Sequence, residues 1–351
     1  MRKWLENAWW SRRPSALATL LLPLSALMGL LGRARRWLYR VRLLRSVHPG
    51  VPVVVVGNIV VGGAGKTPVV QAVIRCLRQA GYRPGVVSRG YPVSPRRPLR
   101  VTSRSTVNEV GDEPLLHYTL GVPVVVCSDR VAAVDALLEA EPATDVVVAD
   151  DALQHYRLAR DIEIEVVSAE RRYGNERLLP AGPLREPLAR AENCVLRLMS
   201  SWVSPAQGYK EGPHHVVKRR LGEAYALVEP ARRTPLATFR GARPAIVAGI
   251  AHPRQFAMAL GRVGVDGELY EFPDHHAFRK RDFDRLGERT VLMTEKDATK
   301  CRSFADHRMW AVPLTVHFAV ETKRKLLRAI RMANERLGRV DHTGHNESET
   351  A

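Results

Sequence analysis

The segment GNIVVGGAGKTP, residues 57–68, carries the residue types that bind a triphosphate. Glycines allow a tight loop whose backbone N–H groups point inward at phosphate oxygens. The ammonium of Lys66 is expected to reach the β- and γ-phosphates, and the hydroxyl of Thr67 is expected to ligate Mg²⁺. The sequence therefore predicts a nucleotide-binding loop made of Gly62, Gly63, Ala64, Gly65, Lys66 and Thr67.

The flanking residues supply the elements that such a loop requires. Residues 51–56 are VPVVVV, a β-branched run typical of a buried parallel strand, and residues 69–82 show the apolar spacing of a helix. Val60 stands where the general pattern has its first glycine, so the match is incomplete. The order strand, loop and helix nevertheless indicates a P-loop.

A second apolar run, DVVVADD at residues 145–151, ends in Asp150 and Asp151. In P-loop enzymes an acidic residue at the end of a neighbouring strand holds the magnesium ion directly or through water. The alternative is that the pair caps a strand-to-helix turn. Gln154 and His155 follow closely and could orient water or an acceptor.

Two further groups could move protons. Asp112 and Glu113 occur in GDEP, where one carboxylate could act as general base for an acceptor hydroxyl and the other could face the metal. The alternative for this pair is a helix N-terminus, where negative charge suits the dipole. FPDHHAF, residues 272–278, contains His275 beside an aspartate, although such histidines are often structural.

Arginine forks match phosphate oxygens, and three arginines in loop-like segments could form an anion-binding rim. They are Arg89 in SRGY, Arg130 in SDR and Arg185 in LPAGPLREP. Taken alone, each is better explained as an ordinary surface arginine.

Taken together and in order, these motifs resemble one family, tetraacyldisaccharide 4′-kinase of lipid A biosynthesis. The segments that carry the resemblance run from residue 57 to 300 and are GNIVVGGAGKTP, SRGY, GDEP, DDALQH, LLPAGPLREP, GIAHPRQF, FPDHHAF and TEKDATK. Lacking the first glycine of the loop pattern is usual in this family, so Val60 agrees with it. Ala152 departs from the family's usual residue at the turn after the paired aspartates, and Pro92 and Val93 depart from it after SRGY, in the region of the acceptor contacts.

The resemblance implies an enzyme that uses ATP and Mg²⁺ at the cytoplasmic face of a Gram-negative inner membrane. Its acceptor would be the 4′-hydroxyl of a tetraacylated glucosamine disaccharide 1-phosphate, and its product lipid IVA. Asp112 would be the catalytic base with His275 as its partner, and Glu113, Asp150 and Asp151 would lie on the metal side. Tyr91, Arg130 and Arg185 would contact the lipid headgroup.

The first fifty residues indicate a membrane surface. Residues 15–31 contain no charged side chain, and arginines stand on both sides of this run. It is short for a spanning helix and contains Pro23 and Gly29. A secretory signal should not be followed by so basic a stretch, and a buried core helix remains an alternative. We expect a helix that enters one leaflet while its arginines meet anionic headgroups.

Composition agrees with an anionic partner. The chain has 54 Lys and Arg against 36 Asp and Glu, a formal net charge of +18. The four cysteines form no CxxC pair, so we expect buried free thiols rather than a zinc site.

Two rival functions are a P-loop GTPase, for which TEKD lacks the asparagine of NKxD, and a nucleic-acid-dependent ATPase, suggested by charge alone. The arginines beside an apolar run fit a membrane better than nucleic acid. The oligomeric state is left open.

The fold class expected is α/β: a P-loop αβα domain with a mostly parallel sheet, a second and smaller α/β domain, and an N-terminal membrane-associated helix. The resemblance implies a β-stranded linker between the domains. The expected ranges are 1–48 for the membrane helix and its basic flank, 49–200 for the nucleotide domain, 201–240 for the linker, 241–338 for the second domain and 339–351 for a flexible tail.

Overall fold

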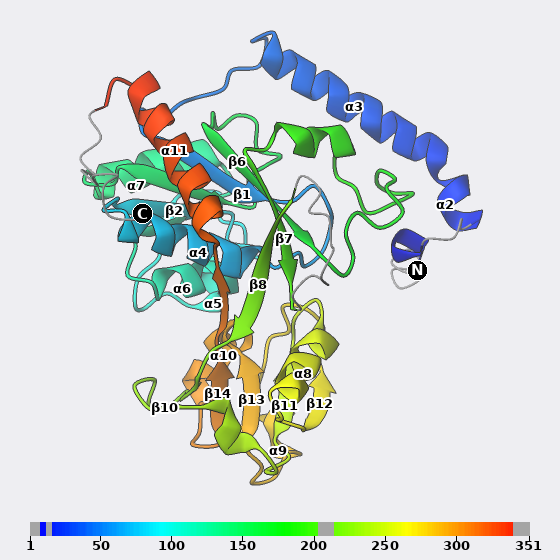
Figure 1. Ribbon diagram of the computed structural model, residues 1–351, viewed down its shortest axis with the longest axis vertical. Coiled ribbons are helices and arrows are strands. Elements are labelled where there is room, and N and C mark those ends of the chain that lie inside the picture. Colours follow the sequence, from blue (N-terminus) through cyan, green and yellow to red (C-terminus); the bar gives the residue numbers. More distant parts are fainter. Residues whose placement is uncertain (1–7, 12–15, 203–213, 340–351) are drawn as a thin grey trace.

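The computed structural model describes residues 8–11, 16–202 and 214–339, which fold into two α/β units (Figure 1). The sheet of the first unit has its two end strands antiparallel and the others parallel to their neighbours. In spatial order its described strands are β15 (Leu314–His317), β8 (His215–Leu221), β7 (Leu196–Ser201), β6 (Ile162–Ser168), β1 (Val53–Gly57), β5 (Val146–Asp150), β2 (Pro84–Ser88), β4 (Val124–Val126) and β3 (Leu99–Arg100).

Helices cover both faces of this sheet, because its central strands are apolar on both sides. Val54 and Val56 of β1 pack in one core cluster with α4 (Lys66–Gln79) and α11 (Val320–Arg336). Val53 and Val55 pack in another with α7 (Arg130–Ala140). The expected three-layer αβα arrangement with a mostly parallel sheet is therefore confirmed.

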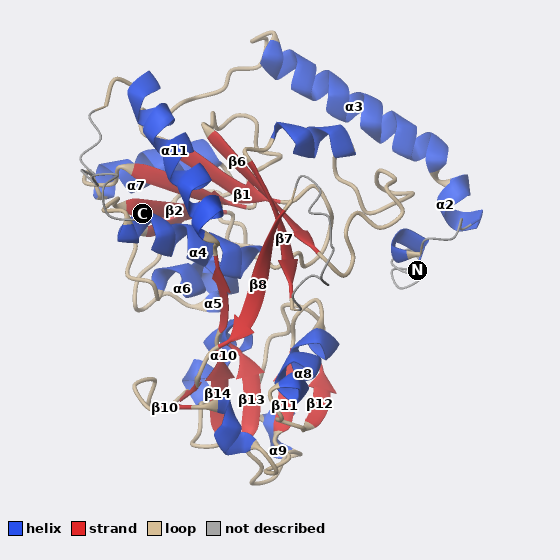
Figure 2. Cartoon of the chain, viewed as in Figure 1, coloured by secondary structure: helices blue, strands red, loops and turns tan. Residues whose placement is uncertain are grey.

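The second unit is smaller and also has helices on both faces of its sheet (Figure 2). Its described strands are, in spatial order, β10 (Arg233–Thr234), β9 (Ala224–Ala226), β14 (Met309–Val312), β13 (Val291–Thr294), β11 (Ala245–Ala248) and β12 (Glu268–Glu271). The helix α8 (Pro253–Arg262) lies on one face, and α9 (Arg281–Asp284) and α10 (Glu295–Cys301) lie on the other. The remaining described elements are α2 (Ala16–Leu20), α3 (Leu22–Arg40), α5 (Val107–Val110), α6 (Asp112–Tyr118), η1 (Leu188–Asn193), η2 (Leu236–Phe239) and η3 (Arg302–Phe304).

The chain crosses between the units where β8 leads to β9 and where β14 leads to β15 (Figure 1). The two crossings lie side by side, since the N–H of Gly222 donates to the carbonyl of Pro313 over 2.9 Å. The structure thus divides the chain differently from the expected ranges. The range 201–240 supplies β8 to the first sheet and β9 and β10 to the second, while β15 and α11, within 241–338, pack on the first unit. The apolar face of α11 is the reason, because Leu326 and Ile330 are buried in the first core.

The helix α3 lies along the outside of the first unit rather than in its core (Figure 1). Its inner face is held by Ser25, whose hydroxyl donates to the carbonyl of Leu178 and accepts from the N–H of Ala181, each over 2.9 Å. Gly29 lets the helix approach closely, because a Cβ there would lie 2.7 Å from Leu178. In the part of the chain that the structure describes, no helix is both long and apolar enough to span a bilayer.

The four cysteines, Cys76, Cys127, Cys194 and Cys301, are buried and free, as expected from their spacing.

Candidate functional site

A cavity of about 950 Å³ lies where the carboxyl ends of the first unit's central strands face the second unit. Residues from the loops that follow β1, β2, β4 and β5 line it on one side, and residues of the second unit line it on the other. Ligands of open parallel sheets bind at this edge. The cavity is therefore the candidate active site.

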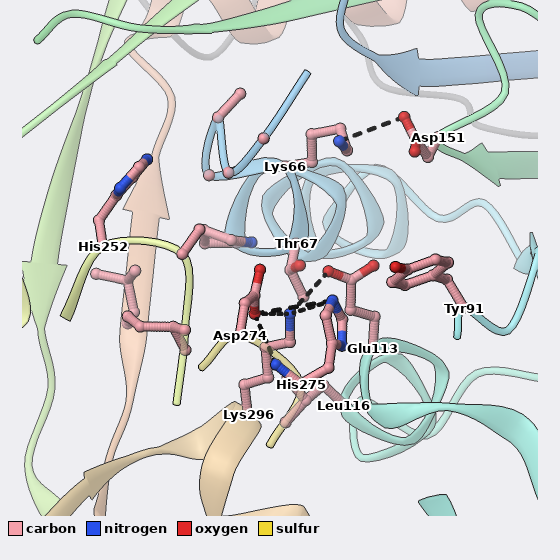
Figure 3. A pocket seen from close by; sticks show the side chains of 18 of the residues that line it. Lys66, Thr67, Tyr91, Glu113, Leu116, Asp151, His252, Asp274, His275 and Lys296 are labelled. Atoms are coloured by element: carbon pink, nitrogen blue, oxygen red, sulfur yellow. Dashed lines mark hydrogen bonds and ion pairs between the residues drawn. The ribbon is translucent and has the colours of Figure 1, made fainter. Parts of the chain in front are cut away.

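The glycine-rich loop forms one wall of this cavity. Gly62 and Gly65 have φ of +93° and +79°, which residues with a Cβ rarely adopt. Gly65 caps α4, so the positive end of a buried 14-residue helix faces the cavity. Lys66 begins that helix, and its Nζ lies 3.3 Å from Oδ1 of Asn58 and 3.3 Å from Oδ1 of Asp151 (Figure 3).

The two adjacent aspartates at the end of β5 have different surroundings. Asp151 lines the cavity beside Lys66, and its Oδ1 also lies 3.4 Å from Nη1 of Arg185. Burial would raise the pKa of Asp151, but the charges of Lys66 and Arg185 outweigh it and lower the pKa to about 2. Asp150 is buried instead, with Oδ2 3.1 Å from Nε2 of the buried His117. Of these two aspartates, Asp151 therefore carries its carboxylate into the cavity and Asp150 does not.

Asp112 and His275 come together across the boundary between the units. Asp112 begins α6 of the first unit, and its Oδ2 lies 3.0 Å from Nδ1 of His275 in the second unit. Burial would raise the pKa of Asp112, but the hydrogen bond with His275 and the charge of Lys296 outweigh it and lower the pKa. A buried, ionised carboxylate beside an imidazole is suited to accept a proton.

Glu113 also lines the cavity, one residue along α6. Burial is the main reason that its pKa is raised; Asp150 and Asp112 add to the effect, against the opposing charge of Lys296. Lys296 was not among the candidate residues from sequence, although it lies in the TEKDATK segment that carried the resemblance. Its position directly after a buried strand was the available signal.

The expected headgroup residues all line the cavity. The ring of Tyr91 lies edge-on to that of His275, with centroids 4.9 Å apart. Arg185 also approaches Gln154, with 3.4 Å between Nη1 and Oε1. Arg130 is held more deeply, its Nη1 donating to the carbonyl of Cys127 over 2.8 Å, and burial lowers its pKa to about 10, so it stays charged at neutral pH. Arg89, Gln154 and His155 line the same cavity.

Sequence reasoning also missed Arg219 of β8, which falls in the range expected to be a linker. Its guanidinium lies against the glycine loop, because a Cβ on Gly65 would be 3.2 Å from Nε of Arg219. The side chain is fixed by a 2.7 Å hydrogen bond from Nε to Oγ of Ser200 and a 3.3 Å bond from Nη1 to Oε1 of Gln255. Nothing in the run HHVVKRRL distinguishes this arginine from its neighbours.

The oxygen donors in the cavity suit Mg²⁺. Thr67, Glu113 and Asp151 supply a hydroxyl and two carboxylates, the hard ligands that this ion prefers. Among the described residues, no group of three or more His, Cys, Asp or Glu side chains is arranged to hold a metal unaided. Mg²⁺ in proteins usually binds through one or two carboxylates together with substrate phosphates.

The chain is similar to known proteins over most of its length. Residues 17–331 match the family model described as LpxK, tetraacyldisaccharide-1-P 4′-kinase. The chain is 46% identical over 323 residues to the tetraacyldisaccharide 4′-kinase of Azoarcus sp. (strain BH72), covering 91% of this chain and 93% of that protein. It is 44% identical over 313 residues to the enzyme of that name from Xanthomonas euvesicatoria pv. vesicatoria, covering 87% and 90%. Among solved structures, that of LpxK from Aquifex aeolicus in complex with ATP matches with a TM-score of 0.76 and 29% identity, covering 90% of this chain and 99% of that one.

Proposed function

The chain belongs to the tetraacyldisaccharide-1-P 4′-kinase family, and we propose that it transfers the γ-phosphoryl group of ATP to the 4′-hydroxyl of a tetraacylated glucosamine disaccharide 1-phosphate, giving lipid IVA. The observation that carries the proposal is the 3.0 Å contact between the buried Asp112 and His275, because His275 lines the cavity that also receives Lys66. A proton acceptor and a triphosphate-binding loop close to each other are the two parts that a kinase needs.

On the nucleotide side, the loop amides and the ammonium of Lys66 bind the phosphates of ATP and neutralise their charge. Thr67, Glu113 and Asp151 would hold Mg²⁺ together with these phosphates. The buried Asp150, which is hydrogen-bonded to His117, would support these side chains from the protein interior. When bound, the ion would neutralise charge on the β- and γ-phosphate oxygens. Lys66 must leave Asp151 at least in part when it turns to phosphate, and Arg185 remains beside that carboxylate.

On the acceptor side, the free oxygen of Asp112 receives the proton of the sugar hydroxyl while Oδ2 stays bonded to His275. Oδ1 of Asp112 is buried and has no hydrogen-bond partner among the described residues, which supports this assignment. Tyr91, Arg130 and Arg185 contact the headgroup, and the positive charges of the two arginines match its phosphate.

We further propose that the exposed face of α2 and α3 rests in the leaflet that holds the lipid substrate, on the cytoplasmic side of the inner membrane. Large apolar side chains are exposed along α2 and α3, although the face of α3 that carries Ser25 packs on the protein. They include Leu20, Leu24, Leu27, Leu30 and Leu31. An amphipathic helix of this kind lies in the membrane interface and does not need to span it.

The decisive experiment incubates pure protein, γ-labelled ATP, Mg²⁺ and the disaccharide lipid dispersed in detergent. Label on the lipid at the 4′-position supports the proposal, and hydrolysis of ATP without transfer to the lipid contradicts it. Replacing ATP by GTP and adding DNA in parallel samples tests the GTPase and nucleic-acid alternatives.

A further inference from the structure

Lys296 lies at the centre of a cluster that joins the two units. It is the second residue of α10, and its side chain is 16% exposed. Its Nζ lies 3.5 Å from Oε1 of Glu113 in the first unit and 3.3 Å from Oδ1 of Asp274 in the second. It also lies 3.3 Å from Nε2 of His275 and 3.9 Å from Oδ2 of Asp112 (Figure 3).

We propose that Lys296 is a positioning residue for phosphoryl transfer, whose ammonium holds the Asp112–His275 pair in its reactive arrangement across the boundary between the units. This inference rests on the proposed function, because it concerns the same acceptor side of the cavity. Lys296 acts through the pair and does not itself take the proton or the phosphoryl group.

The first argument concerns hydrogen-bond roles. An ammonium only donates, so Nε2 of His275, which faces Lys296, must accept. An ionised carboxylate only accepts, so Nδ1 of His275 must carry the proton that it shares with Asp112. Lys296 therefore selects the tautomer of His275 that can donate to Asp112. With the other tautomer, Nδ1 and the carboxylate would present lone pairs to each other.

The second argument concerns charge. Three carboxylates, those of Asp112, Glu113 and Asp274, surround the ammonium of Lys296, and they come from both units. Without it, α6 and the loop of residues 274–275 would present like charges to each other in a partly buried place, which is unfavourable. His275 has a φ of +60°, uncommon for a residue with a side chain, so this loop needs such support to keep its shape.

The third argument separates Lys296 from its neighbour one turn along α10. Nζ of Lys300 lies 3.6 Å from Oδ2 of Asp112, but it is also paired at 3.0 Å with Asp297, which accepts from the N–H of Gly249. Lys300 thus belongs to the internal framework of the second unit, whereas Lys296 is the lysine placed between His275 and Glu113. Lys296 already donates to Asp274 and His275 and is paired with Glu113, which disfavours a primary role as a phosphate ligand.

The test compares Lys296→Met, which keeps the apolar stem, with Lys296→Arg, which keeps the charge, and with Lys280→Met on the exposed surface of the second unit. For Lys296→Met we expect kcat in the lipid kinase assay to fall about 100-fold, because small misplacements of catalytic groups have effects of this size, while the KM for ATP changes by less than about threefold. Lys296→Arg should recover most of the loss, and Lys280→Met should match the unaltered protein. A kcat close to that of the unaltered protein, or a loss confined to the KM for ATP, would overturn the proposal.

A double-variant comparison asks whether Lys296 acts through His275. In a His275→Gln background, adding Lys296→Met should reduce kcat by less than about threefold, since the pair is already broken. If the fold-losses in kcat of the two substitutions multiply in full, Lys296 acts independently of His275 and the proposal is wrong. If Lys296→Met does not fold, Lys296→Gln takes its place in both comparisons.

A measurement that needs no turnover separates this inference from the proposed function. In NMR spectra of protein with ¹⁵N-labelled histidine, His275 should show the proton on Nδ1 in the unaltered protein and a mixture of tautomers in Lys296→Met. Unchanged tautomers would contradict the proposal even if the kinase assay succeeds. Conversely, if the unaltered protein does not phosphorylate the lipid, the proposed function is refuted. The NMR result would still show whether Lys296 sets the tautomer of His275.

Discussion

The carboxylate of Asp112 and the imidazole of His275 lie 3.0 Å apart although 163 positions separate them in the chain. One belongs to α6 of the first unit and the other to a loop of the second, so the pair exists only while the units face each other. Activity should therefore depend on the boundary between the units as well as on the groups themselves.

Asp112→Asn removes the proton acceptor while keeping the size of the side chain. Turnover should fall on the order of 10²-fold or more, because general-base catalysis contributes at least this much. Affinity for ATP, measured by calorimetry, should change little, since Asp112 is not placed at the glycine loop. Asp284→Asn, on the exposed surface of α9, serves as the control. Normal turnover in Asp112→Asn would disprove the assignment of the base.

Lys66→Met removes the ammonium at the start of α4. We expect ATP affinity to fall roughly 10- to 100-fold, the usual worth of a hydrogen bond to a charged group. The variant should still fold, because Lys66 bonds to Asn58 and Asp151 at the cavity wall and not in a core cluster. Unchanged ATP affinity would mean that the loop does not bind phosphate.

Asp150 and Asp151 should respond differently to substitution. Asp150→Ala leaves His117 buried without its partner and should lower the free energy of unfolding by about 3 kcal/mol, measured by urea denaturation. Asp151→Ala should lower stability less than Asp150→Ala does, because its carboxylate is partly exposed, and it should raise the Mg²⁺ concentration needed for half-maximal activity. The reverse pattern would show that the two roles have been exchanged.

Stability should decrease as the pH is lowered from about 6.5 towards 4. His155, His214 and His252 have their pKa values lowered to about 4, first by burial and then by nearby arginines. In this window the unfolded chain binds protons that the folded chain does not, so the free energy of unfolding falls with falling pH. Urea denaturation at pH 7 and pH 5 measures the difference, and His214→Gln should reduce it. An undiminished difference in that variant would contradict the assignment to His214.

The outward face of α3 should control binding to lipid. Leu27→Glu with Leu31→Glu should weaken sedimentation with vesicles that contain anionic lipid, because these side chains are 51% and 56% exposed and their burial in a leaflet would be lost. Thermal stability should not change. Val228→Glu, which alters an apolar residue with 54% exposure in the second unit, is the matched control. Equal sedimentation of all three proteins would argue against a leaflet-bound helix.

Much of the site was predictable because its signals are local in sequence. A β-branched run, a glycine loop and Lys66-Thr67 specify the nucleotide loop within twenty residues, since phosphate binding needs consecutive backbone amides. The carboxylate at the end of β5 was predictable because neighbouring parallel strands end at one edge. The boundaries of the units were not predictable from the sequence. The last strand and helix, β15 and α11, return to the first unit, where Leu326 and Ile330 pack in its core.

The sequence by itself determined the αβα fold of the first unit, the nucleotide loop and the list of acidic and basic groups, because each depends on residues close together in the chain. Only the tertiary structure decided that Asp151 and not Asp150 faces the cavity, that Arg219 lies against the glycine loop and that Lys296 lies between Glu113 and His275. The first two relationships depend on how distant segments of the first unit pack, and the third depends on how the two units meet. Contacts between distant segments leave no periodic pattern in either segment alone.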